Sequence, residues 1–80
     1  MRVVICGAGE VGTTIARHLA TEGINVTVID SDPALIRRVD ESYDVRGVVG
    51  HASHPETLEK AGARDADMLI AVTRSDEVNM

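Results

Sequence analysis

The residues with the clearest chemical potential form a glycine-rich segment near the amino terminus and a single carboxylate further along the chain. The segment is GAGEVG, and its residues are Gly7, Ala8, Gly9, Glu10, Val11 and Gly12. Asp30 follows at a separation of about 20 residues. Backbone amides in such a segment can hold a pyrophosphate, and a carboxylate at this separation can accept hydrogen bonds from the hydroxyls of an adenosine ribose. This spacing predicts a site for an adenine nucleotide.

Each glycine of the segment is expected to have its own task. Gly7 allows a sharp exit from the preceding strand, Gly9 lets the backbone approach a phosphate, and Gly12 lets the following helix pack tightly. The free N–H groups of the first helical turn and the positive end of the helix dipole then bind the anion. Glu10 places a like charge in this turn, and we expect its side chain to point outward into solvent.

Asp30 also bears on which nucleotide can bind. A carboxylate at this position repels a 2′-phosphate, and no arginine follows directly to neutralise one, because Arg37 and Arg38 lie beyond the first turn of the next predicted helix. NAD is therefore favoured over NADP. ATP, ADP and AMP remain alternatives, since they present the same ribose to Asp30.

Three further candidates follow predicted strands at the sheet edge where ligands bind. His51 comes after the third strand and could contact the adenosine end of a nucleotide. Thr73 and Arg74 come after the fourth strand and could contact phosphate or ribose. His51 and His54 form an H-x-x-H pair without a third ligand at fixed spacing, so no metal site is predicted.

No catalytic set accompanies these binding residues. Tyr43 is followed four positions later by Gly47, so the Tyr-x-x-x-Lys pair of short-chain dehydrogenases is missing. No base recurs with an orienting acid at a useful spacing. Cys6 lies inside a predicted buried strand, where a small packing residue is expected rather than a redox group. The sequence therefore indicates nucleotide binding and stops before any reaction.

The elements that position these residues alternate between strand and helix. Short apolar runs rich in Val and Ile predict strands at residues 2–6, 25–29, 45–49 and 68–72. The β-α-β order predicts an α/β fold with a Rossmann-like parallel sheet. We expect the strand order 3-2-1-4, right-handed crossovers and helices on both faces.

The helices are predicted from their caps and apolar faces. The first follows the glycine segment and should end at Gly23. The side that it turns to the sheet should comprise Val11, Ile15, Ala16 and Leu19. The second should begin at residues 31–33, and the third at Ser53, the first residue of an S-x-x-E capping box. A fourth is expected to begin after Thr73.

Residues 1–80 are expected to form the amino-terminal part of a single Rossmann-type nucleotide-binding domain. A doubly wound domain usually has six strands, and this chain supplies the first half and one strand of the second. The fourth strand would then be a bare hydrophobic edge, so the isolated chain is expected to be marginally stable and to self-associate. Because Tyr43 is the one large aromatic residue, Val, Ile, Leu and Ala must build the core.

The composition excludes several classes of partner. Thirteen acidic residues against eight basic ones give a formal charge of −5, and no basic run is present, which argues against nucleic acid and anionic membrane surfaces. No apolar stretch approaches the ~18 residues of a membrane span, so no direct membrane insertion is expected. The single Cys6 cannot form an intramolecular disulfide. A cytoplasmic location is expected.

Four pieces of the sequence together resemble one family. They are GAGEVG, VIDSDP, VVGHASHPETLEKAGARDADMLIAVT and SDEVNM, and they cover almost the whole chain. They resemble the N-terminal NAD-binding domain of the TrkA-type potassium uptake regulators, the RCK or KTN domain. Many RCK domains have Asp where His51 stands, and the G-H-x-S-H-P form is similar to the TrkA branch.

The resemblance implies a cytoplasmic regulatory subunit that is not an enzyme. It would assemble as a homo-oligomeric ring beneath a potassium-translocating membrane subunit, at the inner face of the cell membrane. Binding of NAD(H), or of ATP or ADP, would change the ring shape and so gate the pore. By position, the nucleotide contacts would be residues 7–12, Asp30, His51, Thr73 and Arg74. The alternative, from a different class, is the cofactor-binding half of an NAD-dependent dehydrogenase.

Overall fold

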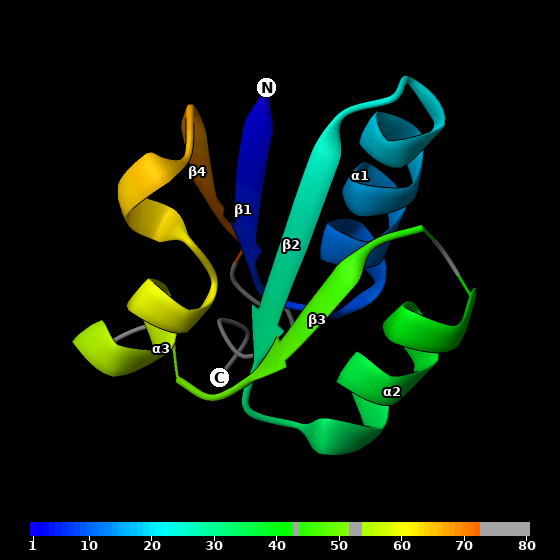
Figure 1. The fold of residues 1–80 in the computed structure, drawn as a ribbon. Helices are drawn as coiled ribbons and strands as arrows, with labels where there is room; N and C mark the ends of the chain where they lie inside the picture. The colour runs from blue at the N-terminus through cyan, green and yellow to red at the C-terminus, as the bar shows by residue number, and fades with distance from the viewer. Residues whose placement is uncertain (43, 52–53, 73–80) are drawn as a thin grey trace, which may run out of the picture.

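A four-stranded parallel sheet forms the centre of the chain (Figure 1). The computed structural model describes residues 1–42, 44–51 and 54–72. The strands are β1 (Arg2–Cys6), β2 (Asn25–Asp30), β3 (Arg46–Val49) and β4 (Met68–Ala71). The helices are α1 (Glu10–Thr21), α2 (Pro33–Ser42) and α3 (Pro55–Lys60), with a 3₁₀ turn η1 (Ala63–Asp65).

The sheet has the predicted order β3-β2-β1-β4, which confirms the α/β fold class. Three predicted strand boundaries were wrong by one residue. The second strand extends to Asp30, the third begins at Arg46 instead of Val45, and the fourth ends at Ala71 instead of Val72. Asp30 is included because its main chain still pairs with Val49 in the ladder to β3.

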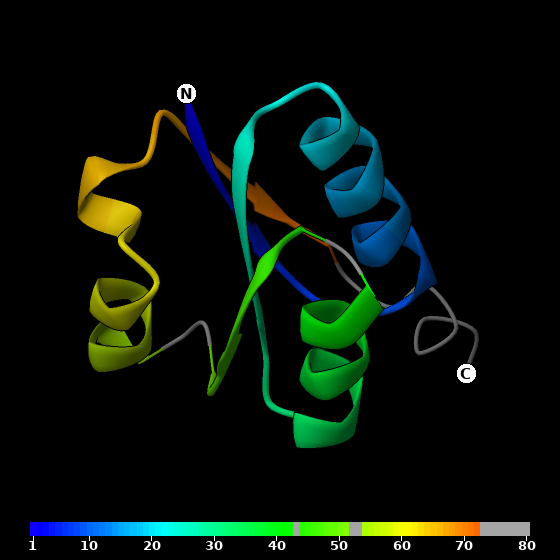
Figure 2. The ribbon, with the colours of Figure 1, turned by 45° about the vertical axis from the view of Figure 1, so that its right-hand side comes forward.

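Helices cover both faces of the sheet. After a 45° turn, α1 and α2 lie on one side of the strands and α3 with η1 on the other (Figure 2). The parallel crossovers bring the carboxyl ends of all four strands to one edge, the lower edge in Figure 1. Among the described residues, both helix layers therefore cover the faces of the sheet and leave its carboxyl edge uncovered.

The core consists of small aliphatic side chains, as the lack of aromatic residues predicted. Alternate residues of β1 and β2 enter opposite layers, as the period of two in a strand requires. Val3, Ile5, Val26 and Val28 pack towards α1 and α2. Val4 and Ile29 pack with Val48 and Ala61 on the α3 side.

The carboxyl ends of the strands continue into turns that are bonded to the neighbouring strands. The N–H of Gly7 donates to the carbonyl of Ile29 at 2.7 Å, and the N–H of Gly50 donates to the carbonyl of Asp30 at 2.9 Å. The N–H of Val72 donates to the carbonyl of Cys6 at 2.9 Å. These bonds fix where each connection leaves the sheet.

One residue of the predicted packing face of α1 was placed wrongly. Val11 is 61% exposed, whereas Ala16 is fully buried and Ile15 and Leu19 are partly buried against the core. In the first turn, Gly12 is the residue that faces the sheet, because a Cβ on it would overlap the carbonyl oxygen of Gly7. Adjacent helical residues point about 100° apart, so Val11 is directed elsewhere.

The ends of the helices agree with prediction at α1 and differ at α3. Gly23 has a φ of +82°, and the N–H groups of Gly23 and Ile24 donate to the carbonyls of Ala20 and Leu19. This pair of bonds is the Schellman motif, a common helix stop. For α3 the predicted N-cap Ser53 was wrong, because His54 is the N-cap and Pro55 opens the helix. Proline suits this position, where its missing N–H would have no helical partner.

Candidate functional site

The turn between β1 and α1 is shaped by Gly7. Its φ is +124°, a value that favours glycine, and a Cβ here would lie 2.7 Å from the carbonyl oxygen of Val72. Gly7 therefore lets the chain leave β1 close beside the end of β4. The predicted sharp exit at this residue is what the structure contains.

Gly9 leaves space where a phosphate is expected to bind. A Cβ on this residue would meet no described atom within 4 Å. Gly9 is also the N-cap of α1, and an α-helix has no acceptors of its own for the N–H groups of its first turn, here Glu10, Val11 and Gly12. Open space beside donors that have no acceptor within the helix, at the positive end of its dipole, fits a phosphate group.

Asp30 lies directly beside this turn. Its Oδ2 accepts a hydrogen bond from the N–H of Ala8 at 2.8 Å, and its Oδ1 accepts one from the N–H of Asp32 at 2.9 Å. A carboxylate offers about four acceptor positions, so positions remain for ribose hydroxyls. The structure thus brings together the glycine turn and the acidic residue that the spacing had paired.

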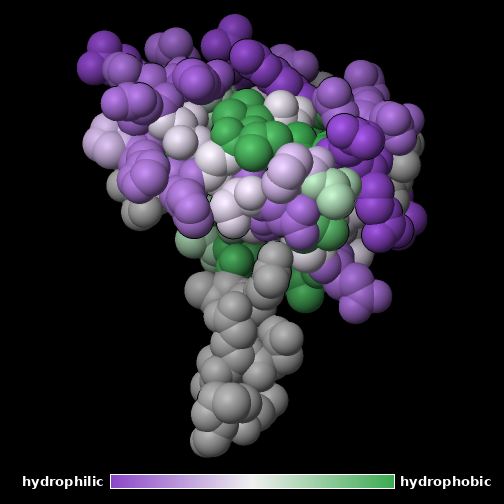
Figure 3. All heavy atoms as spheres, turned by 90° about the horizontal axis from the view of Figure 1, so that it is seen from below, coloured by the Kyte–Doolittle hydropathy of each residue, from purple (hydrophilic) through white to green (hydrophobic). Residues whose placement is uncertain are grey.

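Figure 3 views the molecule from below, towards the carboxyl edge of the sheet. Hydrophobic residues are exposed within this face, and hydrophilic residues surround them (Figure 3). Val11 in the first turn of α1 and Val49 at the end of β3 are both large apolar residues that are more than half exposed. The edge therefore offers apolar contact surface next to the donors of the turn.

A cavity of about 280 Å³ opens at this turn, between α1 and α2. It is lined by Ala8 and Gly9, by the acidic Glu10, and by two basic residues, Arg17 from α1 and Arg38 from α2. The sequence had suggested that Arg37 and Arg38 lie too far along their helix to neutralise a 2′-phosphate, and it gave no reason to consider Arg17. The helical period could have found Arg38, because Arg38 and Val39 follow Leu35 by three and four residues, and both Leu35 and Val39 also line the cavity.

A larger cavity, of about 650 Å³, lies at the amino ends of the strands, where Arg2, Asn25 and Arg46 line it. It is remote from the glycine turn. Ligands of open parallel α/β sheets bind outside the carboxyl ends of the strands. The smaller cavity therefore adjoins the candidate nucleotide site at the glycine turn, and its lining does not include Asp30 or His51.

His51 lies at the same edge, after Gly50, and is exposed. Its ring centroid is 5.4 Å from that of His54, with the planes tilted by 58°. Within residues 1–42, 44–51 and 54–72, no three His, Cys, Asp or Glu side chains are grouped as metal ligands. A contact between His51 and the adenosine end of a nucleotide stays a prediction.

Thr73 and Arg74 lie outside the described residues, as does the predicted fourth helix. The segment that leads to them is placed at the site, because the N–H of Val72 donates to the carbonyl of Cys6 at the end of β1. Their contacts with phosphate or ribose remain predictions.

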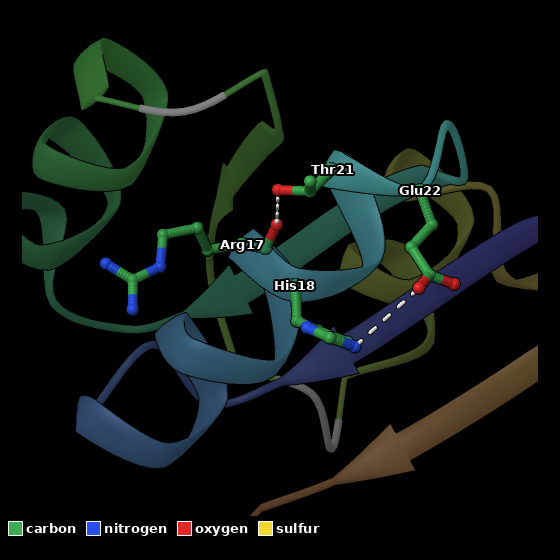
Figure 4. Close-up of polar contacts among 4 residues, drawn as sticks. All are labelled: Arg17, His18, Thr21 and Glu22. Carbon is green, nitrogen blue, oxygen red and sulfur yellow. Dashed lines mark hydrogen bonds and ion pairs between the residues drawn. The ribbon is translucent and has the colours of Figure 1, made fainter.

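Two other reactive side chains do not take part in this site. Burial raises the pKa of the Cys6 thiol, which keeps it protonated at neutral pH, as expected for a packing residue. His18 is exposed on α1, with Nε2 3.8 Å from a carboxylate oxygen of Glu22 one turn later. Figure 4 shows His18 turned toward Glu22, while Arg17 extends to another side of the helix.

The amino-acid sequence matches the TrkA-N domain family over residues 3–80. Among its relatives are the Trk system potassium uptake proteins TrkA of Azorhizobium caulinodans, Halomonas elongata and Vibrio alginolyticus. They are 58%, 51% and 50% identical to this chain over 80 residues. The matches cover the whole of this chain and 18% of each relative, so the chain spans less than a fifth of their length.

A solved structure, the Kef CTD of Shewanella denitrificans in its AMP-bound form, has the same fold. The TM-score is 0.75 and the identity 31%, over 96% of this chain and 46% of that one. In the part of our structure that is described, no helix is both long and apolar enough to cross a bilayer. Because the family matches nearly every residue, and the glycine turn and Asp30 lie together at the carboxyl edge, the chain belongs to the TrkA-N domain family.

Proposed function

We propose that this chain is the nucleotide-binding module of a regulatory subunit in a potassium uptake system. The observation that carries the proposal is the bond from Ala8 to Asp30, which sets a ribose acceptor beside the open space over Gly9. The names of the relatives supply the physiological setting. The AMP-bound form of the Kef neighbour supports an adenine nucleotide as the ligand class.

The proposed ligand is NAD, as NAD⁺ or NADH, with ATP or ADP as alternatives at the same site. The amides of the glycine turn would bind the phosphates and Asp30 the ribose hydroxyls. His51 would contact the adenosine end, and Thr73 with Arg74 a phosphate or the ribose. Asp30 would disfavour the 2′-phosphate of NADP by charge repulsion.

In the full-length protein, the module would act as the N-terminal part of a Rossmann-type domain in a homo-oligomeric ring. The ring would lie on the cytoplasmic side of the membrane, bound to a potassium-translocating subunit of the Trk type. Nucleotide binding would change the ring shape and so the activity of that subunit. In this proposal the module is not an enzyme, and it would act through the change in ring shape that follows nucleotide binding.

Titration calorimetry of the full-length protein with NADH, NAD⁺, NADP⁺, ATP and ADP tests the proposal. Asp30→Ala should weaken NAD⁺ and ATP alike, by about 1–3 kcal/mol, because hydrogen bonds to a charged group are lost. Asp40→Ala is the matched control, since Asp40 is an exposed carboxylate that lines the cavity at the amino ends of the strands. Its affinities should equal those of the wild type.

A turnover assay separates the two classes of protein. Stoichiometric binding of NADH without its consumption supports the regulatory module. Oxidation of NADH with any substrate would instead favour the dehydrogenase alternative and contradict the proposal. Unchanged affinity of Asp30→Ala for both ligands would show that the ribose is bound elsewhere.

A further inference from the structure

We infer that Asp30 is a positioning residue for the phosphate-binding turn, in addition to its proposed contact with the ribose. Its carboxylate would hold the glycine turn in the shape that binds an anion, with or without a nucleotide. The ligand-binding part of this inference rests on the proposed function, and its structural part does not.

The N–H of Ala8 is buried and depends on Asp30 for its acceptor. Ala8 lies between two glycines and is 3% exposed, so water has little access to replace the 2.8 Å bond from its N–H to Oδ2 of Asp30. A buried amide that loses its acceptor is costly and tends to move to find another. Within the described part of the chain, Asp30 is the one side chain that accepts a hydrogen bond from this amide.

Further hydrogen bonds connect the other residues of the glycine turn to β2 and α1. The N–H of Gly7 is bonded to the main chain of Ile29, the residue before Asp30. The hydroxyl of Thr13 donates to the carbonyl of Ala8 at 3.0 Å, and the N–H of Thr13 donates to the carbonyl of Gly9 at 2.9 Å. Ala8 is thus bonded to β2 through its N–H and to α1 through its carbonyl. The bond to β2 is made by the side chain of Asp30.

The other carboxylate oxygen of Asp30 bonds to the loop before α2. Oδ1 accepts from the N–H of Asp32, whose own carboxylate accepts from the N–H of Ala34 at the start of α2. Asp30 therefore connects the glycine turn to the loop that leads into α2. The two walls of the 280 Å³ cavity, α1 and α2, begin at these two bonded segments.

Charge and position predict opposite effects of removing this carboxylate. A carboxylate next to an anion site repels the anion, so its loss through charge alone would tighten the binding of phosphate compounds. If Asp30 positions the turn, its loss should weaken the same compounds, including those that lack ribose hydroxyls. Inorganic pyrophosphate and 2′,3′-dideoxy-AMP are such compounds.

The first measurement is the affinity of the full-length protein for AMP, 2′,3′-dideoxy-AMP and pyrophosphate. Asp30→Ala should weaken pyrophosphate and dideoxy-AMP roughly 5- to 10-fold, the effect of about one hydrogen bond on the turn. Asp32→Ala is the control, because it removes the same charge nearby but caps α2 and not the turn. It should leave both affinities unchanged or slightly tighter. Equal or tighter binding in Asp30→Ala would overturn the inference.

The second measurement needs no ligand. Hydrogen exchange of the Ala8 amide should be at least roughly 10-fold faster in Asp30→Ala, because its acceptor is gone. The amide of Val28, in the centre of the sheet, should exchange as in the wild type and thereby report an intact fold. Unchanged exchange at Ala8 would overturn the inference.

Two further outcomes are informative. Should Asp30→Ala fail to fold, Asp30→Asn retains the shape and one acceptor oxygen, and its Ala8 amide should exchange faster than in the wild type and more slowly than a solvent-exposed amide. The wild-type protein could bind no nucleotide while its Ala8 amide still exchanges more slowly than that of Asp30→Ala. This result would refute the proposed function and support the positioning role. The failure of one claim is therefore distinguishable from the failure of the other.

Discussion

The Cα of Gly12 lies so close to the carbonyl oxygen of Gly7 that no side chain fits between them. This contact brings the first turn of α1 against the exit of β1, and a Cβ would also lie 3.6 Å from Cγ2 of Ile5. At Gly9, three residues earlier, the added Cβ meets no described atom within 4 Å. Two glycines of one motif thus have different reasons to be glycine.

Gly12→Ala and Gly9→Ala should therefore separate stability from binding. Gly12→Ala should lower the free energy of unfolding by roughly 3 kcal/mol or more, since a backbone overlap cannot relax as a side chain does. Gly9→Ala should leave stability within about 1 kcal/mol of the wild type, because its φ of −72° suits alanine. It should weaken nucleotide binding by occupying phosphate space. Denaturant unfolding and calorimetry measure the two effects, and a Gly9→Ala variant with wild-type affinity would contradict the proposed phosphate position.

The effects of substitutions at Gly47 and Ile36 on the free energy of unfolding should be coupled across the interface between β3 and α2. A Cβ on Gly47 would lie 2.6 Å from Cγ2 of Ile36, a buried residue. Gly47→Ala should destabilise the fold by roughly 1–3 kcal/mol through overpacking, and Ile36→Ala by about 2–5 kcal/mol through a cavity. Because Ile36→Ala removes the clashing methyl group, the double variant should be more stable than the sum predicts, by about 1–2 kcal/mol.

The control for this cycle is Gly47→Ala combined with Val4→Ala. Val4 packs in the core layer on the other face of the sheet, so these two changes should add. Equal coupling in both cycles would show that Gly47→Ala acts on the fold as a whole and not on Ile36.

The raised pKa of the Cys6 thiol should make stability fall at high pH. The folded chain holds the thiol proton more tightly than the unfolded chain, so this contribution is present below the ordinary thiol pKa of 9.0 and is lost as the pH rises through the raised value. The free energy of unfolding should decline more steeply above pH 9.0 in the wild type than in Cys6→Ala. Native Cys6 should also react slowly with thiol reagents at neutral pH. Parallel pH profiles for the two proteins would rule out this linkage.

The edge of β4 should promote association of the isolated 80-residue chain. Met68 and Leu69 are 49% and 54% exposed, and no described residue pairs with the outer edge of this strand. Leu69→Lys should shift the chain towards monomer, because a charged side chain disfavours strand pairing at an edge. Thr21→Lys, an exposed change on α1, should not. Sedimentation velocity at several concentrations provides the test, and a wild-type chain that stays monomeric throughout would refute the expectation.

The features that the sequence alone determined are those with a local physical cause. Short apolar runs rich in Val and Ile predict strands, Gly23 predicts a helix stop, and the glycine spacing predicts a tight turn before a helix. Strand order 3-2-1-4 followed, because short right-handed crossovers leave few other arrangements. The pairing of Asp30 with the glycine turn was predicted from the G-x-G-x-x-G spacing and the separation of about 20 residues to the carboxylate.

Tertiary structure decided what depends on contacts between distant segments. The hydrogen bond from the N–H of Ala8 to the carboxylate of Asp30 joins residues 22 apart, and spacing alone did not predict it. Val11 is exposed, because Gly12 and not Val11 turns toward the sheet. Arg38 lines the cavity because α1 and α2 lie on the same face of the sheet and border it from two sides (Figure 2). Residue type and spacing predict the general face of a helix, but the packing of the segments decides which residue at the margin of that face meets a neighbour.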